Sequence, residues 1–533
     1  MNENSDSPIL QASSASADNS GSTRASHSSP AILTERPKKL KFFMDGAWHE
    51  SKTNDYMPVT NSSTGALMAE APRCTEEEVN ACVEAAAAAF PAWRDTPLAK
   101  RVQVMFRYKA LLDKHKDELA TLLSTEMGKT LAEAHGDIFK AIEVVELACA
   151  TPVTMQGRSA MNTSTGYDTV SYREPLGVFV GIAPFNFPAM IPMGWMIPLA
   201  ITTGNTYVLK AASMVPQTAM RMVELLSEAG LPKGVVNLVT ASRHEAEPLL
   251  KHPMVRGVTL VGSKQVGLHV YQTAAAEGKR VQSLTEAKNH ALILRDAPVA
   301  ATALRVINSA FGCAGERCMA LPAICVEEEI ADEMVGTIID LAKKLKMGPA
   351  WLPETDLGPM VTGEHREDVH GWVEKGVGEG GELVLDGRGA VVPGCEGGYF
   401  MGATVFDRVT PGLRIGVDEI FGPVLSVKRV RDFEEGLAEM NASEFANGSA
   451  IFTMNGKYAR EFSRRTDAGM VGVNVGIPVP ISSFPFCGHK NSFYGDLHVM
   501  GTDGIAFFTE TKAVTSYWFD EADLKGAKVG TWS

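Results

Sequence analysis

The spacing of apolar residues changes along the chain and separates helical from strand-forming stretches. Between Thr75 and Ala150 apolar residues recur every three or four positions, which predicts helices. Thr75, followed by three glutamates, predicts the start of the first helix. Further on, continuous apolar runs alternate with helical stretches, and these runs are GVFVGIAPF, TYVLKAA, GVVNLVT and GVTLVGS. Strands that are apolar on both faces are typical of a parallel sheet covered by helices, so this part predicts an α/β domain.

A second alternating set begins near Ala291, with HALILRDA, AICVEE and VLSVKRV as its strands. The chain therefore predicts two α/β domains in series. Ahead of both, KKLKFFMDGAWHES predicts a first strand and turn. Near the end, GIAFFTETKAVTSYW has strand composition and predicts pairing outside the main sheets.

Length and charge narrow the class of protein. A chain of 533 residues exceeds one compact core and predicts about two to four domains. The net charge of −13 argues against a nucleic-acid-binding protein, which needs a basic face. The longest apolar run, Ala189 to Ala200, is too short for a membrane span and is broken by prolines.

Two further features suggest a cytoplasmic protein. The eight cysteines are irregularly spaced, which fits reduced thiols better than a disulfide framework. Residues 1–38 are rich in Ser, Ala, Asn and Asp and predict a disordered N-terminal tail. The tail has no apolar signal core, and its acidic residues fit a transit peptide poorly.

Several short motifs combine chemistry with a suitable place in the fold. In VTLVGSKQVGLHVYQTA, the Gly262-Ser263 turn precedes a helix whose N-terminus suits a phosphate, although the same turn also serves as a plain connection. Lys210 ends a strand and points to a ligand crevice, or else is a solvated lysine. Asn186, in APFNFPAM, is either an oxyanion donor or a turn-former. Glu419, in DEIFGPV, is either an acceptor for ribose hydroxyls or a solvent-facing carboxylate.

The stretch SAFGCAGERCMALP holds two cysteines five residues apart. No further Cys or His lies at metal-ligand spacing, so a metal site is not predicted. Cys313, between Gly312 and Ala314, has the surroundings of a small core residue. Cys318 follows Arg317, whose charge favours the reactive thiolate, so a nucleophile and a packing residue are both open here.

Taken together and in order, PFNFP, VLKAA, VGSKQVG, GERCMA, EIFGP and PFCGHKNSFYGD resemble the aldehyde dehydrogenase superfamily over residues 40 to 525. AGERCMA, VGVNVGIPVPISSFPF and SFYGDLH resemble its CoA-acylating, methylmalonate-semialdehyde-oxidising members. The resemblance implies an α/β fold with a Rossmann-type cofactor domain, an α/β catalytic domain and a small β oligomerisation element. It assigns residues 39–160 and 176–290 to NAD binding, 291–490 to catalysis, and 161–175 with 491–533 to a homodimer or homotetramer interface.

The resemblance also implies roles for single residues. Cys318 is the nucleophile, and Asn186 with the Cys318 backbone N–H stabilises the oxyanion. Arg317 and Lys140 bind a substrate carboxylate. The residues implied to contact the cofactor are Ala183, Phe185, Lys210, Ser213, Gly262, Ser263, Gly267, Glu419 and Phe421. No metal is implied.

Three departures from the family pattern bear on function. SLTEAKNH stands where hydrolytic members have LELGGK and CoA-acylating members LGGAKNH, so Thr285-Glu286 replaces the double glycine, and Glu286 does not align with the hydrolytic base. Lys140 replaces an arginine that binds the substrate carboxylate, and lysine lacks the bidentate fork. Ser213 replaces the glutamate of KPSE, which predicts weaker discrimination against NADP.

The sequence thus predicts NAD-dependent oxidation of a semialdehyde, of the methylmalonate or malonate type, through a cysteine thioester whose acyl group passes to CoA. The first alternative is a hydrolytic aldehyde dehydrogenase that uses Glu286 and releases a free acid. The second is a non-catalytic module that kept the fold, although Cys318, Asn186, Lys210 and Glu419 are all present. The expected partners are an aldehyde, CoA and further copies of the chain, with neither nucleic acid nor membrane.

Overall fold

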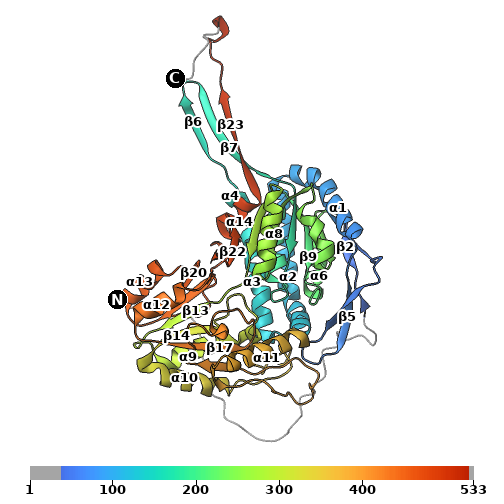
Figure 1. The fold of residues 1–533 in the computed structure, drawn as a ribbon. Helices are drawn as coiled ribbons and strands as arrows, with labels where there is room; N and C mark the ends of the chain where they lie inside the picture. The colour runs from blue at the N-terminus through green and yellow to red at the C-terminus, as the bar shows by residue number, and fades with distance from the viewer. Residues whose placement is uncertain (1–37, 522, 527–533) are drawn as a thin grey trace, which may run out of the picture.

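The computed structural model describes residues 38–521 and 523–526, in which two large sheets with covering helices carry a thin projecting arm (Figure 1). Of the tail predicted to be disordered, residues 1–38, all but Lys38 lies outside the described residues, and Lys38 belongs to the strand β1 (Lys38–Lys39). In the described part of the chain, no helix has both the length and the apolarity that crossing a bilayer requires.

The first sheet has eight strands in the order β22-β12-β11-β8-β9-β10-β2-β3. The five from β12 to β10 are mutually parallel, while β22, β2 and β3 are antiparallel to their neighbours. The strands are β2 Phe42–Met44, β3 Ala47–His49, β8 Val178–Ile182, β9 Thr206–Ala211, β10 Val236–Thr240, β11 Val255–Val261, β12 Arg280–Leu284 and β22 Phe493–Gly495. The four predicted apolar runs are therefore adjacent parallel strands, buried on both faces because helices cover both.

Helices pack on this sheet and form the largest apolar core. They are α1 Glu76–Asp95, α2 Leu98–Met127, α3 Leu131–Cys149, α4 Thr151–Thr154, the π-helix η1 Ile191–Met196, α5 Ile197–Thr202, α6 Gln217–Glu228, α7 Arg243–Ala246, the 3₁₀ turn η2 Glu247–Leu250 and α8 Lys264–Ala276. Thr75 caps α1 in a capping box with Glu78, as its sequence predicts. Thr130 and Glu133 form the same box at the start of α3.

The second sheet has seven strands in the order β15-β16-β17-β14-β13-β19-β20, all parallel except the β15 edge. The strands are β13 His290–Ile293, β14 Ala323–Glu327, β15 Glu382–Leu385, β16 Thr404–Asp407, β17 Val424–Val430, β19 Gly448–Phe452 and β20 Met470–Val473. Its helices are α9 Val299–Phe311, η3 Gly312–Gly315, α10 Glu328–Ala342, α11 Gly363–Gly378, η4 Arg414–Gly416, α12 Phe433–Asn441 and α13 Gly456–Arg465. The loop of residues 285–289 runs from β12 of the first sheet directly into β13 of this one.

The arm is an antiparallel sheet of β6 Ser159–Ser164, β7 Tyr167–Pro175 and β23 Thr509–Tyr517 that projects from the body (Figure 1). Smaller elements are β1 Lys38–Lys39, β4 Tyr56–Thr60, β5 Leu67–Pro72, β18 Phe445–Ala446, β21 His489–Lys490, α14 Gly501–Phe507 and η5 Asp523–Lys525. The C-terminal strand does pair outside the main sheets, but GIAF belongs to α14, so the prediction of strand there was wrong at its start. β22, within the 491–533 segment assigned to the β element, instead extends the first sheet. The exact domain bounds stay a prediction.

Candidate active site

Cys318 lies in the loop between α9 and β14, and this loop is tightly folded. Cys313, Ala314 and Gly315 have φ values of 51°, 50° and 75°, so the chain turns through three left-handed residues in a row. At Gly315 a Cβ atom would lie 2.1 Å from the backbone oxygen of Gly422, so only glycine fits. The loop is thereby pressed against Phe421-Gly422-Pro423, which follows Glu419.

Asn186 joins this loop to the first sheet. It follows the carboxyl end of β8, is buried, and donates from Nδ2 to the backbone oxygen of Glu316 at 3.0 Å. The structure therefore brings together Asn186 and the loop that carries Cys318, although 130 residues separate Asn186 from Glu316. A carboxamide has two N–H donors, so the second remains available to an oxyanion.

Cys318 is partly exposed, and its surroundings favour the thiol. Desolvation raises its pKa to about 12, the carboxylate of Glu419 acts in the same direction, and Lys129 with the Cys318 and Met319 backbone N–H groups opposes them. The described chain without cofactor thus holds Cys318 protonated at neutral pH. The sequence predicted that the charge of Arg317 favours the thiolate of Cys318. In the structure the Arg317 guanidinium makes its hydrogen bonds to other groups.

Arg317 donates from Nε to the Sγ of Cys313 at 3.1 Å and from Nη2 to Glu133 Oε1 at 3.0 Å. Lys140 pairs with Glu143 at 2.7 Å, and the second oxygen of Glu143 accepts from the Ser482 amide. Glu133 and Lys140 lie seven residues apart on α3, which is two helical turns or about 10 Å. Both implied carboxylate binders are therefore paired with acidic side chains of one helix.

The cofactor side of the site begins at Lys210, near the carboxyl end of β9. No hydrogen bond or ion pair of its ammonium is found among the described residues, and burial lowers its pKa to about 8. It lines a pocket of about 150 Å³ together with the apolar residues Ile182, Leu250, Val266 and Val270. Ala183 donates its N–H to the Lys210 backbone oxygen at 3.0 Å, and Ser213 contacts the Ala241 backbone oxygen at 3.5 Å.

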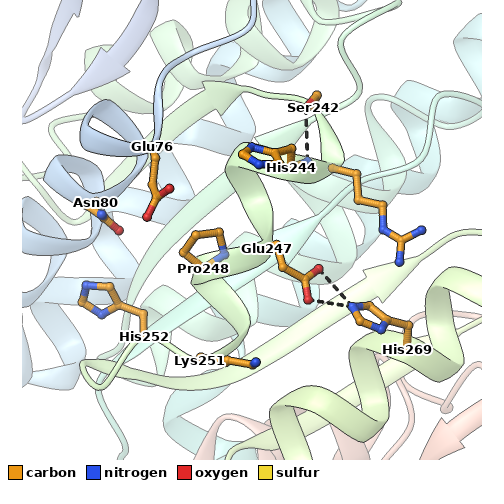
Figure 2. Close-up of a pocket in the computed structure, with 10 residues that line it drawn as sticks. Glu76, Asn80, Ser242, His244, Glu247, Pro248, Lys251, His252 and His269 are labelled. Carbon is orange, nitrogen blue, oxygen red and sulfur yellow. Dashed lines mark hydrogen bonds and ion pairs between the residues drawn. The ribbon is translucent and has the colours of Figure 1, made fainter.

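A larger pocket of about 980 Å³ adjoins this one and shares Arg243, Glu247 and His269 with it. Figure 2 shows it between the start of α1, with Glu76 and Asn80, and the η2 turn, with Glu247 bonded to His269. The slot near Lys210 thus adjoins a larger groove, and the two share part of their lining.

The turn after β11 places Gly262 and Ser263 at the N-terminus of α8. Gly262 donates to the Leu284 backbone oxygen at 3.1 Å, and the Ser263 hydroxyl makes no capping bond to the helix. At Gly267 a Cβ would lie 2.1 Å from Thr285 Cγ2, so glycine lets α8 pack closely on β12 and the following loop.

Glu419 and Phe421 approach the same loop from the second domain. Glu419 accepts from the Ala287 N–H at 3.0 Å, and burial raises its pKa to about 8. Phe421 has φ +59° and packs edge-to-face on Phe185 at a ring distance of 5.7 Å. Glu419 and Phe421 therefore reach across to the side of the first sheet, whereas Lys210 and Ser213 contact residues of the first sheet and its helices.

Two polar residues near Cys318 were missed from the sequence. Asn289 donates to the backbone oxygens of Cys318 and Ala320 at 2.9 and 2.8 Å and accepts from Gly448 at 2.8 Å, which holds the nucleophile loop in place. Its signal was the polar AKNH cluster directly before a buried strand. Lys129 is fully buried in an ion pair with Asp137 at 2.8 Å and is the cation that opposes the raised pKa of Cys318. Its signal was a Gly-Lys-Thr turn between two long helices.

Among the described residues, no group of three or more His, Cys, Asp or Glu is arranged to hold a metal.

Residues 48–514 match the aldehyde dehydrogenase family. The malonate-semialdehyde dehydrogenase of Bacillus cytotoxicus is 45% identical over 92% of this chain and 100% of its own length. Malonate-semialdehyde dehydrogenase 2 of Geobacillus kaustophilus is 46% identical over 91% of this chain and 100% of its own.

Solved structures agree with these relatives. A Sinorhizobium meliloti 1021 protein, provisionally described as a methylmalonate-semialdehyde dehydrogenase and complexed with NAD, superposes with a TM-score of 0.90 at 39% identity, covering 92% of this chain and 100% of that one. The methylmalonate-semialdehyde dehydrogenase of Oceanimonas doudoroffii gives a TM-score of 0.89 at 39% identity, covering 91% and 100%. The match over residues 48–514 and the similarity to these relatives over their whole length show that the chain belongs to the aldehyde dehydrogenase family.

Proposed function

We propose that the protein oxidises a malonate- or methylmalonate-type semialdehyde with NAD and transfers the acyl group from Cys318 to CoA. The observation that carries the proposal is the bond from Asn186 to the backbone oxygen of Glu316, because it holds an amide donor against the loop that carries the Cys318 thiol. The relatives named malonate-semialdehyde dehydrogenase, which match over their whole length, support the choice of substrate.

The proposed chemistry uses groups that the site holds. The Cys318 thiol releases its proton to solvent and its sulfur adds to the aldehyde carbon. The oxyanion that forms accepts from the free N–H of Asn186 and the Cys318 backbone N–H. Bound NAD supplies the hydride acceptor. The acyl group then remains on Cys318 as a thioester, which the thiol of CoA attacks, and this restores the cysteine.

The residues on the cofactor side fit a dinucleotide. The apolar slot beside Lys210 suits an adenine ring, the unbonded ammonium suits a ribose or phosphate oxygen, and Glu419 is an acceptor for ribose hydroxyls. The NAD complex of the Sinorhizobium meliloti protein supports NAD. Ser213 brings no charge against a 2′-phosphate, so we propose that NADP is tolerated as well. Complete exclusion of NADP in binding measurements would count against that part.

CoA rather than water is proposed as acceptor because of where the carboxylates lie. SLTEAKNH has no glutamate where LELGGK carries its base. Glu286, the substitute considered for a hydrolytic enzyme, accepts a hydrogen bond from the backbone N–H of Lys264 at 3.0 Å. In the structure this carboxylate is bonded to the N-terminus of α8 and not to the loop of Cys318.

An acidic aldehyde is proposed because two cations, Arg317 in the loop of Cys318 and Lys140 on α3, both contact side chains of α3. Their pairs with Glu133 and Glu143 mean that a substrate carboxylate must compete with internal ones. Lysine at position 140 offers a point charge rather than a fork, so affinity for the acid is expected to be modest.

The arm is proposed to join copies of the chain into a homodimer or homotetramer. It exposes large apolar side chains, with Met161 84%, Tyr172 55%, Trp518 64% and Phe519 81% exposed, in a part of the molecule that projects from the body (Figure 1). Eight free cysteines support our proposal of a reducing, cytoplasmic setting. Sedimentation velocity of the full chain tests the assembly.

A single-turnover experiment tests the thioester step. The protein is mixed with NAD and malonate semialdehyde without CoA, and NADH and the intact protein mass are followed. We expect a burst of one NADH per site and an acyl adduct on Cys318, both absent in Cys318→Ser and kept in the control Cys313→Ser. Asn186→Ala should slow the burst about 10²- to 10³-fold. A full burst in Cys318→Ser would contradict the proposed nucleophile.

A further inference from the structure

Glu286 lies in the loop that joins the two large sheets, at the first turn of α8. Its Oε1 accepts from the backbone N–H of Lys264, the first residue of the helix, at 3.0 Å. Ser263 stands at the capping position, yet its hydroxyl makes no capping bond. The helix is therefore capped by a glutamate 22 residues further along the chain.

The backbone on both sides of Glu286 is fixed. Thr285 donates its N–H to the Ser492 backbone oxygen at 2.9 Å and its hydroxyl to that of Asn491. The Ala287 N–H is held by Glu419 at 3.0 Å. Glu286 itself is only partly buried, between two buried neighbours. Its side chain can therefore leave α8 by rotation while the loop stays in place.

The position that Glu286 takes is one that attracts anions. The first N–H groups of an α-helix lack partners within the helix and lie at its positive end. The 13-residue helix α8 follows the Gly262-Ser263 turn, where a cofactor pyrophosphate is expected. A carboxylate bonded there satisfies the same donor and brings a negative charge to the same place.

Charged side chains nearby add to the competition between the Glu286 carboxylate and a pyrophosphate. Glu419 faces the loop from the second domain, and its pKa is raised first by burial and further by the Glu286 carboxylate. The ammonium of Lys264 is paired with Glu444 rather than with Glu286. An incoming pyrophosphate therefore meets the carboxylate of Glu286 at the helix N-terminus. The ammonium of Lys264 is already paired and does not offset that negative charge.

We propose that Glu286 is an internal competitor of the dinucleotide, whose carboxylate occupies the pyrophosphate's place on α8 and must rotate away before the cofactor binds. The inference rests on the proposed function for the identity of the ligand as a dinucleotide. On this proposal Glu286, which stands where the family pattern has a glycine, lowers the affinity for the cofactor and does not replace a catalytic base.

Isothermal titration of the full chain tests this without any turnover. The ligands are NAD, ADP and adenosine, and the variants are Glu286→Gln, which keeps an acceptor oxygen but no charge, and Glu286→Ala, which removes both. Asp432→Asn is the matched control, because its carboxylate likewise accepts from a helix N-terminus, that of α12, through the Glu435 N–H at 3.0 Å. We expect NAD and ADP to bind about fivefold tighter or more in both Glu286 variants. Adenosine, which has no phosphate, should change less than about twofold, and Asp432→Asn should leave all three affinities within about twofold.

Unchanged or weaker NAD and ADP binding in both Glu286 variants would overturn the competitor role while leaving the proposed function in place. An equal gain for adenosine would also overturn it, because the effect would then come from pocket shape. Failure of NAD and ADP to bind to any variant would overturn both the inference and the cofactor assignment. Glu286→Gln keeps the result interpretable if the loss of the helix cap destabilises Glu286→Ala.

Discussion

Replacing Lys129 with Met tests how much the buried ion pair of Lys129 and Asp137 stabilises the protein. The ammonium of Lys129 lies 2.8 Å from Asp137 Oδ2, and both side chains are 0% exposed. The other oxygen of Asp137 accepts from the Met190 N–H at 2.7 Å, so this carboxylate also fixes the start of η1. Removal of the cation leaves Asp137 buried with one backbone donor.

We expect Lys129→Met to lower the free energy of unfolding by about 3–5 kcal/mol at pH 7.5, the usual cost of an uncompensated buried charge. Burial raises the pKa of Asp137 and Lys129 opposes that rise. Without Lys129 the pKa of Asp137 rises further, so the folded variant binds a proton at Asp137 at a higher pH than the wild type does. The deficit of the variant relative to the wild type should therefore shrink as the pH falls from 7.5 to 5.5.

Urea unfolding followed by tryptophan fluorescence measures this cost. Lys129→Met/Asp137→Asn should regain most of the lost stability, because Asn keeps the acceptor for Met190 without the charge. Lys109→Met is the control, since its pair with Asp113 at 2.8 Å is partly exposed and should cost less than about 1 kcal/mol. A cost for Lys129→Met no larger than for Lys109→Met would refute the reasoning.

Three further outcomes follow from the site. Because burial lowers the pKa of Lys210 to about 8, NADP should bind more weakly as the pH rises from 7 to 9. In Lys210→Met the affinity for NADP should not change over this pH range. An affinity of the wild type that does not change with pH would contradict the role of Lys210. Because the pKa of Cys318 is about 12 without cofactor, its alkylation by iodoacetamide should still accelerate at pH 10, and a plateau near pH 8 would count against this environment. Lys140→Arg should lower KM for malonate semialdehyde about threefold or more but not for propanal, and equal effects on both would argue against carboxylate binding.

The strands of the first sheet were accessible from the sequence because their signal is local, whereas their order in the sheet was not predicted. GVFVGIAPF and its three companion runs are apolar on both faces, which a parallel sheet requires, and the structure pairs them as adjacent strands. The capping box at Thr75 has a similar local basis. The start of the C-terminal strand failed because GIAFF is short, and a run of that length suits a buried helix turn equally well.

The candidate site was less accessible because its contacts join distant segments. Arg317 is next to Cys318 in sequence, yet its guanidinium bonds to Cys313 and Glu133, since the turn through three left-handed residues directs it there. The place of Glu286 depends on how the interdomain loop meets α8, which no spacing along the chain expresses. The roles of the individual residues at the site remain predictions.

The central claim is that the acyl group on Cys318 leaves to CoA, and one measurement tests it most directly. Steady-state NADH formation from malonate semialdehyde is followed with and without CoA, and the product is identified by mass. The account predicts that turnover stops after about one NADH per site without CoA and continues with it, giving an acyl-CoA product. Full turnover to a free acid without CoA would contradict the account.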